Sequence, residues 1–234
     1  MNFSKQNKRS QSLKTALTAC AIVLSVSSCV SPKKIDKWIG DQYGEATTLN
    51  KPKANYFTVA SPLVTADSKT SNSVKEHTKV LPLLFYWQFN YKISSTLNPK
   101  IPMNSFVSAF TSYANSKGLK QKLNGQKLEL TIDKMPTTFS FNDDFRDINL
   151  LLAQIRWEKI YLLPENADMA ISYKLIKDNG EIKNGVINIA DPNKLKQKKY
   201  FQKMKTATQD YLAQYDENIR SMAKTAVDKV MVDL

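Results

Sequence analysis

The sequence is poor in the residues from which most enzyme sites and metal sites are built. Its 234 residues include one histidine, two cysteines and six glycines. A single histidine leaves one candidate base for a Ser/His/Asp arrangement, and neither an HExxH pattern nor a cysteine pair offers zinc ligands. The few glycines form no phosphate-binding loop. We therefore assign no catalytic residue, cofactor or metal ligand, and we expect a protein that is not an enzyme.

The chain also lacks an apolar run long enough to cross a bilayer, although a shorter one lies near its start. Residues 15–28 are apolar or small throughout, whereas a transmembrane helix needs about 20 apolar residues. Basic residues precede this run without any acidic residue: Lys5, Lys8, Arg9 and Lys14. This layout is typical of an export signal. We expect residues 1–28 to be a signal peptide.

The end of this signal carries an aliphatic residue, two small residues and a cysteine: Val26, Ser27, Ser28 and Cys29. This pattern resembles the lipobox of bacterial lipoproteins. The resemblance implies that the Cys29 sulfur is diacylated, that the chain is cut before Cys29, and that the new amino group is acylated. Each buried methylene contributes about 0.8 kcal/mol, so two or three acyl chains anchor a protein stably.

A second frame, Leu17-Thr18-Ala19-Cys20, also fits a lipobox. The stretch from Lys14 to Cys20 is shorter than the roughly 7 to 15 residues of an apolar signal core, whereas Cys29 leaves a full core. We favour Cys29 as the first mature residue. An uncleaved helix that contains both cysteines is the other alternative, and the basic start argues against it. With Cys29 acylated and Cys20 removed, the mature chain has no thiol for a disulfide.

Basic residues outnumber acidic ones, and this net positive charge indicates which classes of partner the protein can bind. The full chain carries +13, and the part after residue 28 has 30 basic and 21 acidic side chains, a net charge of +9. An exported protein with this excess suits anionic lipid headgroups or acidic glycans such as lipopolysaccharide, and we expect no nucleic-acid partner. Val30 follows Cys29 in place of Asp, which resembles enterobacterial outer-membrane lipoproteins. We expect an outer membrane protein that faces the periplasm; the inner membrane and the cell surface stay open.

Helical spacing of apolar residues predicts a short helix before Gly44, within a lipidated tether of residues 29–54. The residues that carry this spacing are Ile35, Trp38, Ile39 and Tyr43. Such a helix either docks on the body of the protein or rests on the membrane surface, and we favour docking.

Two further helices are predicted in the rest of the chain. Asn104 or Ser105 caps the first, whose apolar face includes Phe106 and Tyr113 and which ends at Lys117-Gly118. The second covers residues 193–234, where apolar residues recur near every 3.6 positions without Gly or Pro.

Alternation of apolar and polar residues predicts strands over 55–60, 81–93, 127–133, 137–141, 150–163, 169–177 and 181–190. The strongest signal predicts one long strand with an apolar row: Leu81, Leu83, Phe85, Trp87, Phe89, Tyr91 and Ile93. We expect this row in the core, with a groove for an acyl chain as the alternative. Asp178-Asn179-Gly180 is the strongest hairpin signal.

Three polar segments lack such alternation. Residues 61–79 predict a mobile loop that holds the only histidine, His77, in solvent. The acidic cluster at residues 142–147 lacks the glycine and the ligand spacing of a calcium loop, so we expect a loop without metal. The basic run at residues 194–199 predicts the solvated start of the last helix in preference to an anion site.

These elements predict an α+β fold: a mostly antiparallel sheet covered by the mid-chain helix and the long C-terminal helix, in one domain of residues 55–234. The element order and the lipobox resemble accessory lipoproteins of envelope transport and assembly, such as the lipopolysaccharide-transport lipoprotein and the auxiliary lipoproteins of ABC-type lipid transporters. The resemblance implies a non-catalytic binding or assembly adaptor in an envelope complex. The rivals are a lipid carrier with its cavity under the last helix, and a lipid- or glycan-modifying enzyme with carboxylates beside Trp87 or Trp157.

Overall fold

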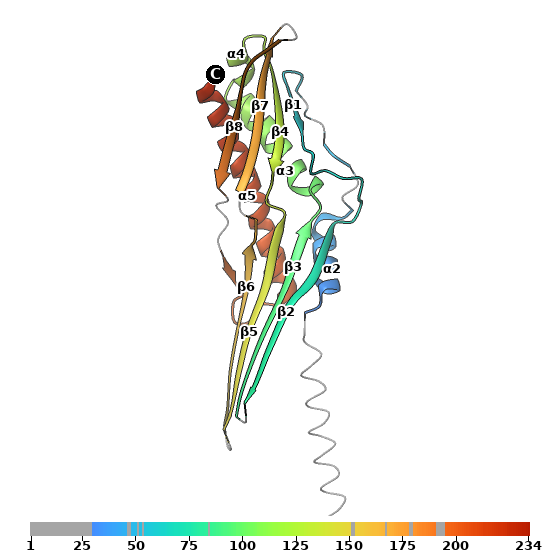
Figure 1. The fold of residues 1–234 in the computed structure, drawn as a ribbon, viewed down its shortest axis with the longest axis vertical. Coiled ribbons are helices and arrows are strands. Elements are labelled where there is room, and N and C mark those ends of the chain that lie inside the picture. Colours follow the sequence, from blue (N-terminus) through green and yellow to red (C-terminus); the bar gives the residue numbers. More distant parts are fainter. Residues whose placement is uncertain are drawn as a thin grey trace, which may run out of the picture. The chain divides into compact units, whose positions relative to one another are not determined.

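The described residues form two sheets in the computed structural model, one of four strands and one of five (Figure 1). The structure describes residues 30–45, 48–50, 52, 54–83, 85–150, 153–166, 168–177, 180–190 and 195–234. All of the helices and strands named below belong to one compact unit, Pro32–Leu234. Pairing is antiparallel except between one pair of strands, so the predicted α+β class with a mostly antiparallel sheet is confirmed.

The four-stranded sheet has the order β1 (Phe57–Ala60), β4 (Lys127–Lys134), β7 (Asp168–Lys177) and β8 (Gly180–Ala190). β1 runs parallel to β4, and the other neighbours are antiparallel. Alternate apolar side chains of β4 and β7 are buried, as a sheet with one covered face requires. The predicted β7–β8 hairpin is confirmed, and Asp178 and Asn179 of its turn lie outside the described residues.

The five-stranded sheet has the order β2 (Ser71–Leu83), β3 (Tyr86–Leu97), β5 (Thr138–Leu150), β6 (Ala153–Pro164) and β9 (Lys196–Gln197). All of its neighbouring strands are antiparallel. Two long hairpins, β2–β3 and β5–β6, therefore lie side by side, joined by the pairing of β3 with β5.

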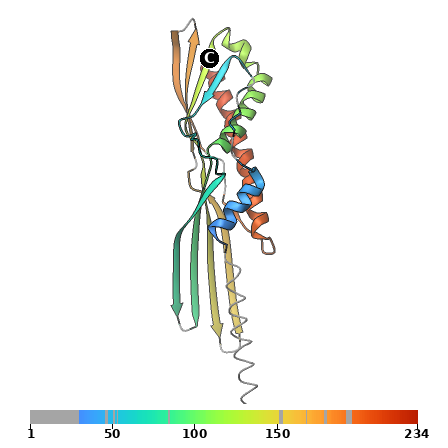
Figure 2. The same cartoon turned by 90° about the vertical axis from the view of Figure 1, so that its right-hand side faces the viewer.

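Helices cover one side of both sheets (Figure 2). α3 (Lys100–Ser116) and α5 (Met204–Asp233) pack on each other and on the four-stranded sheet, and α4 (Leu119–Leu123) follows α3. α2 (Pro32–Tyr43) lies against β2 and α5. Aromatic contacts fill the interior: the rings of Phe57 and Phe110 are 5.1 Å apart between centroids, and those of Phe139 and Tyr211 are 4.9 Å apart.

The predicted single strand over residues 81–93 is wrong, because the chain turns back within it. β2 ends at Leu83 and β3 begins at Tyr86, and Leu83 pairs with Tyr86 across the turn. Leu83 therefore shares a face with Tyr86, and Phe85 does not continue the row that Leu83 occupies. The turn itself contains no glycine or proline. The alternation of apolar and polar residues continues through it in the sequence and therefore predicts one continuous strand.

The predicted mobile loop over residues 61–79 is also wrong in its second half, because β2 begins at Ser71. His77 thus lies in a strand, and its side chain is outside the described residues. β2 is the edge strand of its sheet, and most of its side chains are exposed on both faces. A strand without a covered face has no apolar alternation to detect.

The acidic cluster at residues 142–147 lies in the middle of β5 instead of in a loop. β5 is paired on both sides, with β3 and with β6, so its backbone groups are bonded along the strand whatever its side chains prefer. Tertiary pairing here outweighs the low strand propensity of Asp and Asn.

The last helix starts later than predicted, at Met204 instead of Asn193. The basic run is therefore not a helix start: Lys196 and Gln197 form β9 and pair with β6. Phe201, which fits the apolar stripe of the helix, is 93% exposed. The stripe from Tyr211 to Val230 is buried as predicted, and Met204 and Leu234 are partly exposed.

The mid-chain helix starts earlier than predicted, at Lys100. The predicted caps, Asn104 and Ser105, therefore lie inside the helix. The N-cap is Pro99, and the Lys100 N–H donates a 3.0 Å hydrogen bond to the side chain of Asn98 just before it. The predicted end is confirmed, since Gly118 has a φ of 72° directly after the helix.

Candidate functional site

The predicted lipidation site, Cys29, lies outside the described residues, which begin at Val30. α2 begins three residues after Cys29 and is docked on the body of the protein, as predicted, with Ile35 and Ile39 buried. Asp36 accepts hydrogen bonds from the hydroxyls of Ser71 (2.7 Å) and Ser73 (2.6 Å) of β2. None of the helices in the described part of the chain has the length and apolar content needed to cross a membrane.

α2 is oriented with its first residue toward the far end of β2. Gly44, just after α2, accepts a hydrogen bond from Thr70, whereas Asp36, near the start of α2, accepts from Ser71 and Ser73. Moving backward along α2 therefore means moving forward along β2, toward Leu83 (Figure 1). Pro32, the first residue of α2, lies at this end of the helix.

The two long hairpins extend past the ends of α2 and α5, so none of the helices in the described part of the chain reaches their ends (Figure 2). We call residues 81–83, 85–87, 148–150 and 153–157 the sheet tip. Its large apolar side chains are about half exposed: Leu81, Leu83, Phe85, Trp87, Leu150, Ile155 and Trp157. The prediction that the row from Leu81 to Trp87 is core is wrong for these residues, and holds for Ile93.

Strand register shows that one face of the sheet tip is apolar across both hairpins. The opposite face is apolar on the β2–β3 hairpin and polar on the β5–β6 hairpin, where Asn149 pairs with Gln154. Leu83, Tyr86, Ile148 and Ile155 are cross-strand neighbours and share one face. Trp87 follows Tyr86 and so points to the opposite face, where Pro82 is its partner on β2. An exposed apolar face at the end of a single sheet layer, continued around one of its two hairpins, is unusual for a protein in water.

The boundary between this apolar end and the polar part of the sheet carries one tryptophan and one arginine on each face. Trp87 and Arg156 both pair with Asp147, which places them on one face. Trp157 pairs with Arg146 on the other face. We call these four side chains the collar. Each arginine has an acidic neighbour: Arg146 lies 3.1 Å from Asp144, and Arg156 lies 3.7 Å from Asp147.

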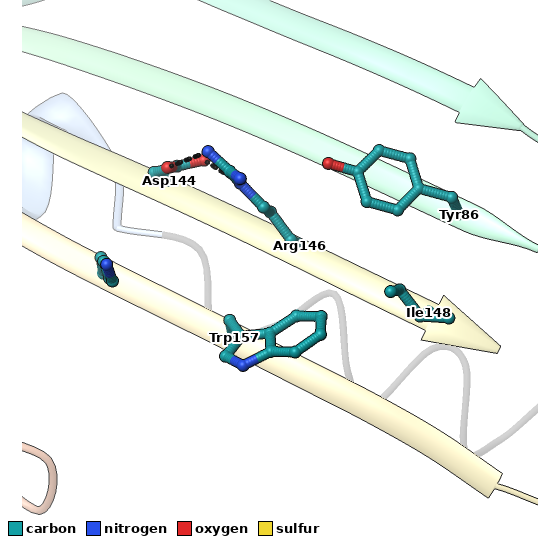
Figure 3. A pocket seen from close by; sticks show the side chains of 6 residues that line it. Tyr86, Asp144, Arg146, Ile148 and Trp157 are labelled. Atoms are coloured by element: carbon teal, nitrogen blue, oxygen red, sulfur yellow. Dashed lines mark hydrogen bonds and ion pairs between the residues drawn. The ribbon is translucent and has the colours of Figure 1, made fainter.

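A shallow hollow of about 380 Å³ lies on the Trp157 face of the collar (Figure 3). Its lining comes from three neighbouring strands: Tyr86, Asp144, Arg146, Ile148, Trp157 and Lys159. Asp144 is the carboxylate beside Trp157, and it is engaged in the ion pair with Arg146. An ion-paired carboxylate on an open surface suits binding better than proton transfer, which needs a carboxyl with a shifted pKa in a closed site.

Asp143 is the carboxyl group nearest the collar whose protonation is strongly altered. Burial, together with the negative charges of Glu158 and Asp144, raises the pKa of Asp143 from its ordinary value to about 7. Its Oδ1 atom is buried without a hydrogen-bond partner. Glu158 lies on the same face as Asp143, whereas Glu165 binds Lys92 at 2.6 Å on the opposite face. Glu158 and Glu165 therefore do not form a carboxylate pair.

The interior under α5 bears on the lipid-carrier alternative. The rings of Phe139 and Tyr211 meet between the five-stranded sheet and α5, and both residues are almost fully buried. Tyr215 is also buried there, and its hydroxyl donates a hydrogen bond to the Pro136 carbonyl. Protein side chains fill this part of the interface, where the carrier alternative places an acyl chain. Among the described residues, no group of three His, Cys, Asp or Glu side chains is placed to hold a metal ion.

Sequence reasoning missed the sheet tip, although a signal for it was present. Apolar residues are concentrated in residues 81–87 and 150–155. Pro82 precedes the first turn by two residues and no glycine or proline lies in either turn, so both segments have the pattern of ordinary core strands. Comparison with models of known protein families, with curated proteins and with solved structures found no match to this chain.

Proposed function

We propose that this protein is a membrane-anchored, non-catalytic lipoprotein that acts as a binding or assembly adaptor in the bacterial cell envelope. Acyl chains on Cys29 hold it at a membrane. The helix-backed sheets form the rigid body that presents surfaces to a partner. By the resemblance of Val30 to the sorting position of outer-membrane lipoproteins, the anchor sits in the outer membrane and the body faces the periplasm.

The observation that carries this proposal is the exposed apolar tip on a body whose interior is filled. Phe139, Tyr211 and Tyr215 occupy the space between sheet and α5, while Leu83 and Phe85 are about half exposed. Large apolar side chains that stay exposed in this way mark interaction sites. The protein therefore has a surface for binding, and its hollow beside Trp157 is open and lined by an ion pair.

The anchor is tested by labelling cells with palmitate and separating membranes from soluble material. We expect Cys29→Ala to lose both the label and membrane association. Cys20→Ala is the matched control and keeps both, because residue 20 is removed with the signal. Label retained by Cys29→Ala, or lost from Cys20→Ala, would overturn the assignment of Cys29.

The adaptor role is tested by affinity purification of the acylated protein from a detergent extract, followed by mass spectrometry. We expect a defined set of envelope proteins in fixed proportion to the bait. A protein that purifies alone under mild detergent conditions contradicts the adaptor role. This result leaves the acylation test unaffected, so the two parts of the proposal are judged separately.

A further inference from the structure

The sheet tip is apolar on one face across both hairpins and on both faces of the β2–β3 hairpin, while Asn149 and Gln154 make the second face of the β5–β6 hairpin polar. Leu83, Tyr86, Ile148 and Ile155 face one side, and Pro82 and Trp87 face the other. Phe85 and Leu150, next to the turns, are 52% and 55% exposed. A flat protein surface covers one face of a sheet and leaves the other in water. A medium that surrounds the hairpin ends covers both faces at once.

The collar has the composition found where proteins cross from lipid to water. Tryptophan and tyrosine rings are enriched at the headgroup level, and arginine side chains extend toward phosphates while their methylene stems stay in apolar surroundings. Trp87 with Arg156 and Trp157 with Arg146 repeat this combination on the two faces of the sheet. A partner protein would favour such a tryptophan–arginine pair only on the one face of the sheet that it contacts. A bilayer surrounds the hairpin ends and favours the pair on both faces.

The depth of the apolar end also fits the interface of a bilayer. Two to three residues separate the β2–β3 turn from Trp87, which is about 7–10 Å at the rise of a strand, comparable to the 5–10 Å depth of interfacial protein elements. Deeper insertion is unfavourable because β2 is an edge strand and β6 is paired by β9 only at Tyr161 and Leu162. Unpaired backbone groups at these edges must remain hydrated.

The start of α2 lies on the side of the protein toward which the hairpin turns point (Figure 1). α2 is bonded to β2 through Asp36, and the start of α2 is its end nearer the tip. Cys29 lies three residues before Pro32, a reach of at most about 11 Å. Acylation at Cys29 therefore brings the five-stranded sheet to the membrane, with its hairpin turns directed toward that membrane.

We infer that the sheet tip inserts into the interfacial layer of a lipid bilayer, with the collar at the level of the headgroups. This inference rests on the proposed acyl anchor, which brings the tip to the bilayer. Two attachments, at Cys29 and at the tip, fix the orientation of the body. The four-stranded sheet is then held away from the membrane, where a partner in an envelope complex reaches it.

The test uses the acylated mature protein in vesicles of phosphatidylethanolamine and phosphatidylglycerol, with lipids brominated near either end of the acyl chain. Variants with one tryptophan report each face: Trp38→Phe with Trp157→Phe leaves Trp87, and Trp38→Phe with Trp87→Phe leaves Trp157. We expect a blue shift and strong quenching of both by bromine near the carbonyl end, and weaker quenching by bromine near the methyl end.

Two controls accompany this measurement. Val186→Trp, in a chain whose native tryptophans are replaced by phenylalanine, reports an exposed apolar position on β8, and we expect no quenching there. Phe85→Asp with Leu150→Asp is expected to abolish quenching of Trp157, because charged side chains at the turns oppose insertion. Ile182→Asp with Val186→Asp is the matched pair away from the tip and leaves quenching unchanged. Far-UV circular dichroism checks that each variant is folded.

Several outcomes overturn the inference. If the protein floats with the vesicles and neither tryptophan is quenched, the tip stays in water or is covered by protein, a second copy included, while the acyl anchor stands. If only one of Trp87 and Trp157 is quenched, the sheet lies flat on the membrane and does not insert. If the protein does not float at all, the anchor and the inference fail together.

Discussion

The hydroxyl of Ser73 donates a 2.6 Å hydrogen bond to Oδ1 of Asp36 and lies 2.8 Å from the hydroxyl of Ser95. This chain of contacts joins α2 to β2 and β2 to β3. Ser73 and Ser95 are both buried, so water does not compete freely for these groups. The segment that follows the predicted acylation site is thereby fixed to the sheet that carries the apolar tip.

Removing this carboxylate should loosen α2. We expect Asp36→Ala to lower the free energy of unfolding by about 2 kcal/mol, because it leaves buried hydroxyls without their charged acceptor. Urea denaturation followed by circular dichroism measures the change. Lys37→Ala is the control: its side chain is 72% exposed and contacts Asp41 within the same helix, so we expect little change. Equal effects of the two substitutions would contradict the role of Asp36.

The raised pKa of Asp143 predicts that stability falls as the pH rises. The unfolded chain loses the Asp143 proton near the ordinary value of 3.8, and the folded chain keeps it to about 7. Between these values the folded state binds more protons, so the free energy of unfolding decreases with pH and then levels off above 7. We expect Asp143→Asn to raise the melting temperature at pH 8 more than at pH 4. A pH-independent effect would count against this assignment.

Gly185 and Gly40 differ in the space around them, so alanine substitutions at these two positions should change stability in opposite directions. A Cβ at Gly185 would lie 2.6 Å from the ring of Tyr173, whereas a Cβ at Gly40 in α2 would meet nothing within 4 Å. We expect Gly185→Ala to destabilise by about 1–3 kcal/mol through overpacking. Gly40→Ala should stabilise by up to about 1 kcal/mol, since alanine favours a helix interior. Thermal unfolding of both variants checks the two signs.

The start of the last helix is tested at Phe201. This side chain is 93% exposed, and Met222 on α5 is buried. We expect Phe201→Ser to change the free energy of unfolding by less than about 0.5 kcal/mol, and Met222→Ala to lower it by about 2–5 kcal/mol. A large loss at Phe201 would mean that this residue belongs to the buried stripe, as the helical spacing alone predicts.

Local sequence patterns correctly predicted those helices and hairpins whose characteristic residues all lie within a short segment. The spacing of Ile35 and Ile39 predicted α2 and its buried side, and Gly118 marked the end of α3. The flanks of the β7–β8 turn predicted that hairpin. In each case the turn residue or the apolar spacing lies within a few positions of the element it specifies, so no distant contact is needed to interpret it.

Pairing between strands that are distant in the sequence determined the features that local patterns did not predict. The turn after Leu83 has no glycine or proline, and the apolar alternation continues through it, although the turn moves Trp87 to the face opposite Leu83. β5 passes through an acidic segment because β3 and β6 bond it on both sides. Likewise, Lys196 and Gln197 become β9 because β6 has a free edge there, which the helical spacing of nearby residues does not reveal.

The sequence by itself determined the α+β class and the amphipathic sides of the helices, because each follows from short-range spacing. The lipid anchor at Cys29 is a prediction that rests on the resemblance to a lipobox. The tertiary structure decided which apolar rows are covered. Alternation places Trp87 and Ile93 in one row, yet Ile93 is buried and Trp87 is 48% exposed. The difference arises because the helices end before the hairpins do, and the length of sheet that a helix covers depends on how the distant segments dock.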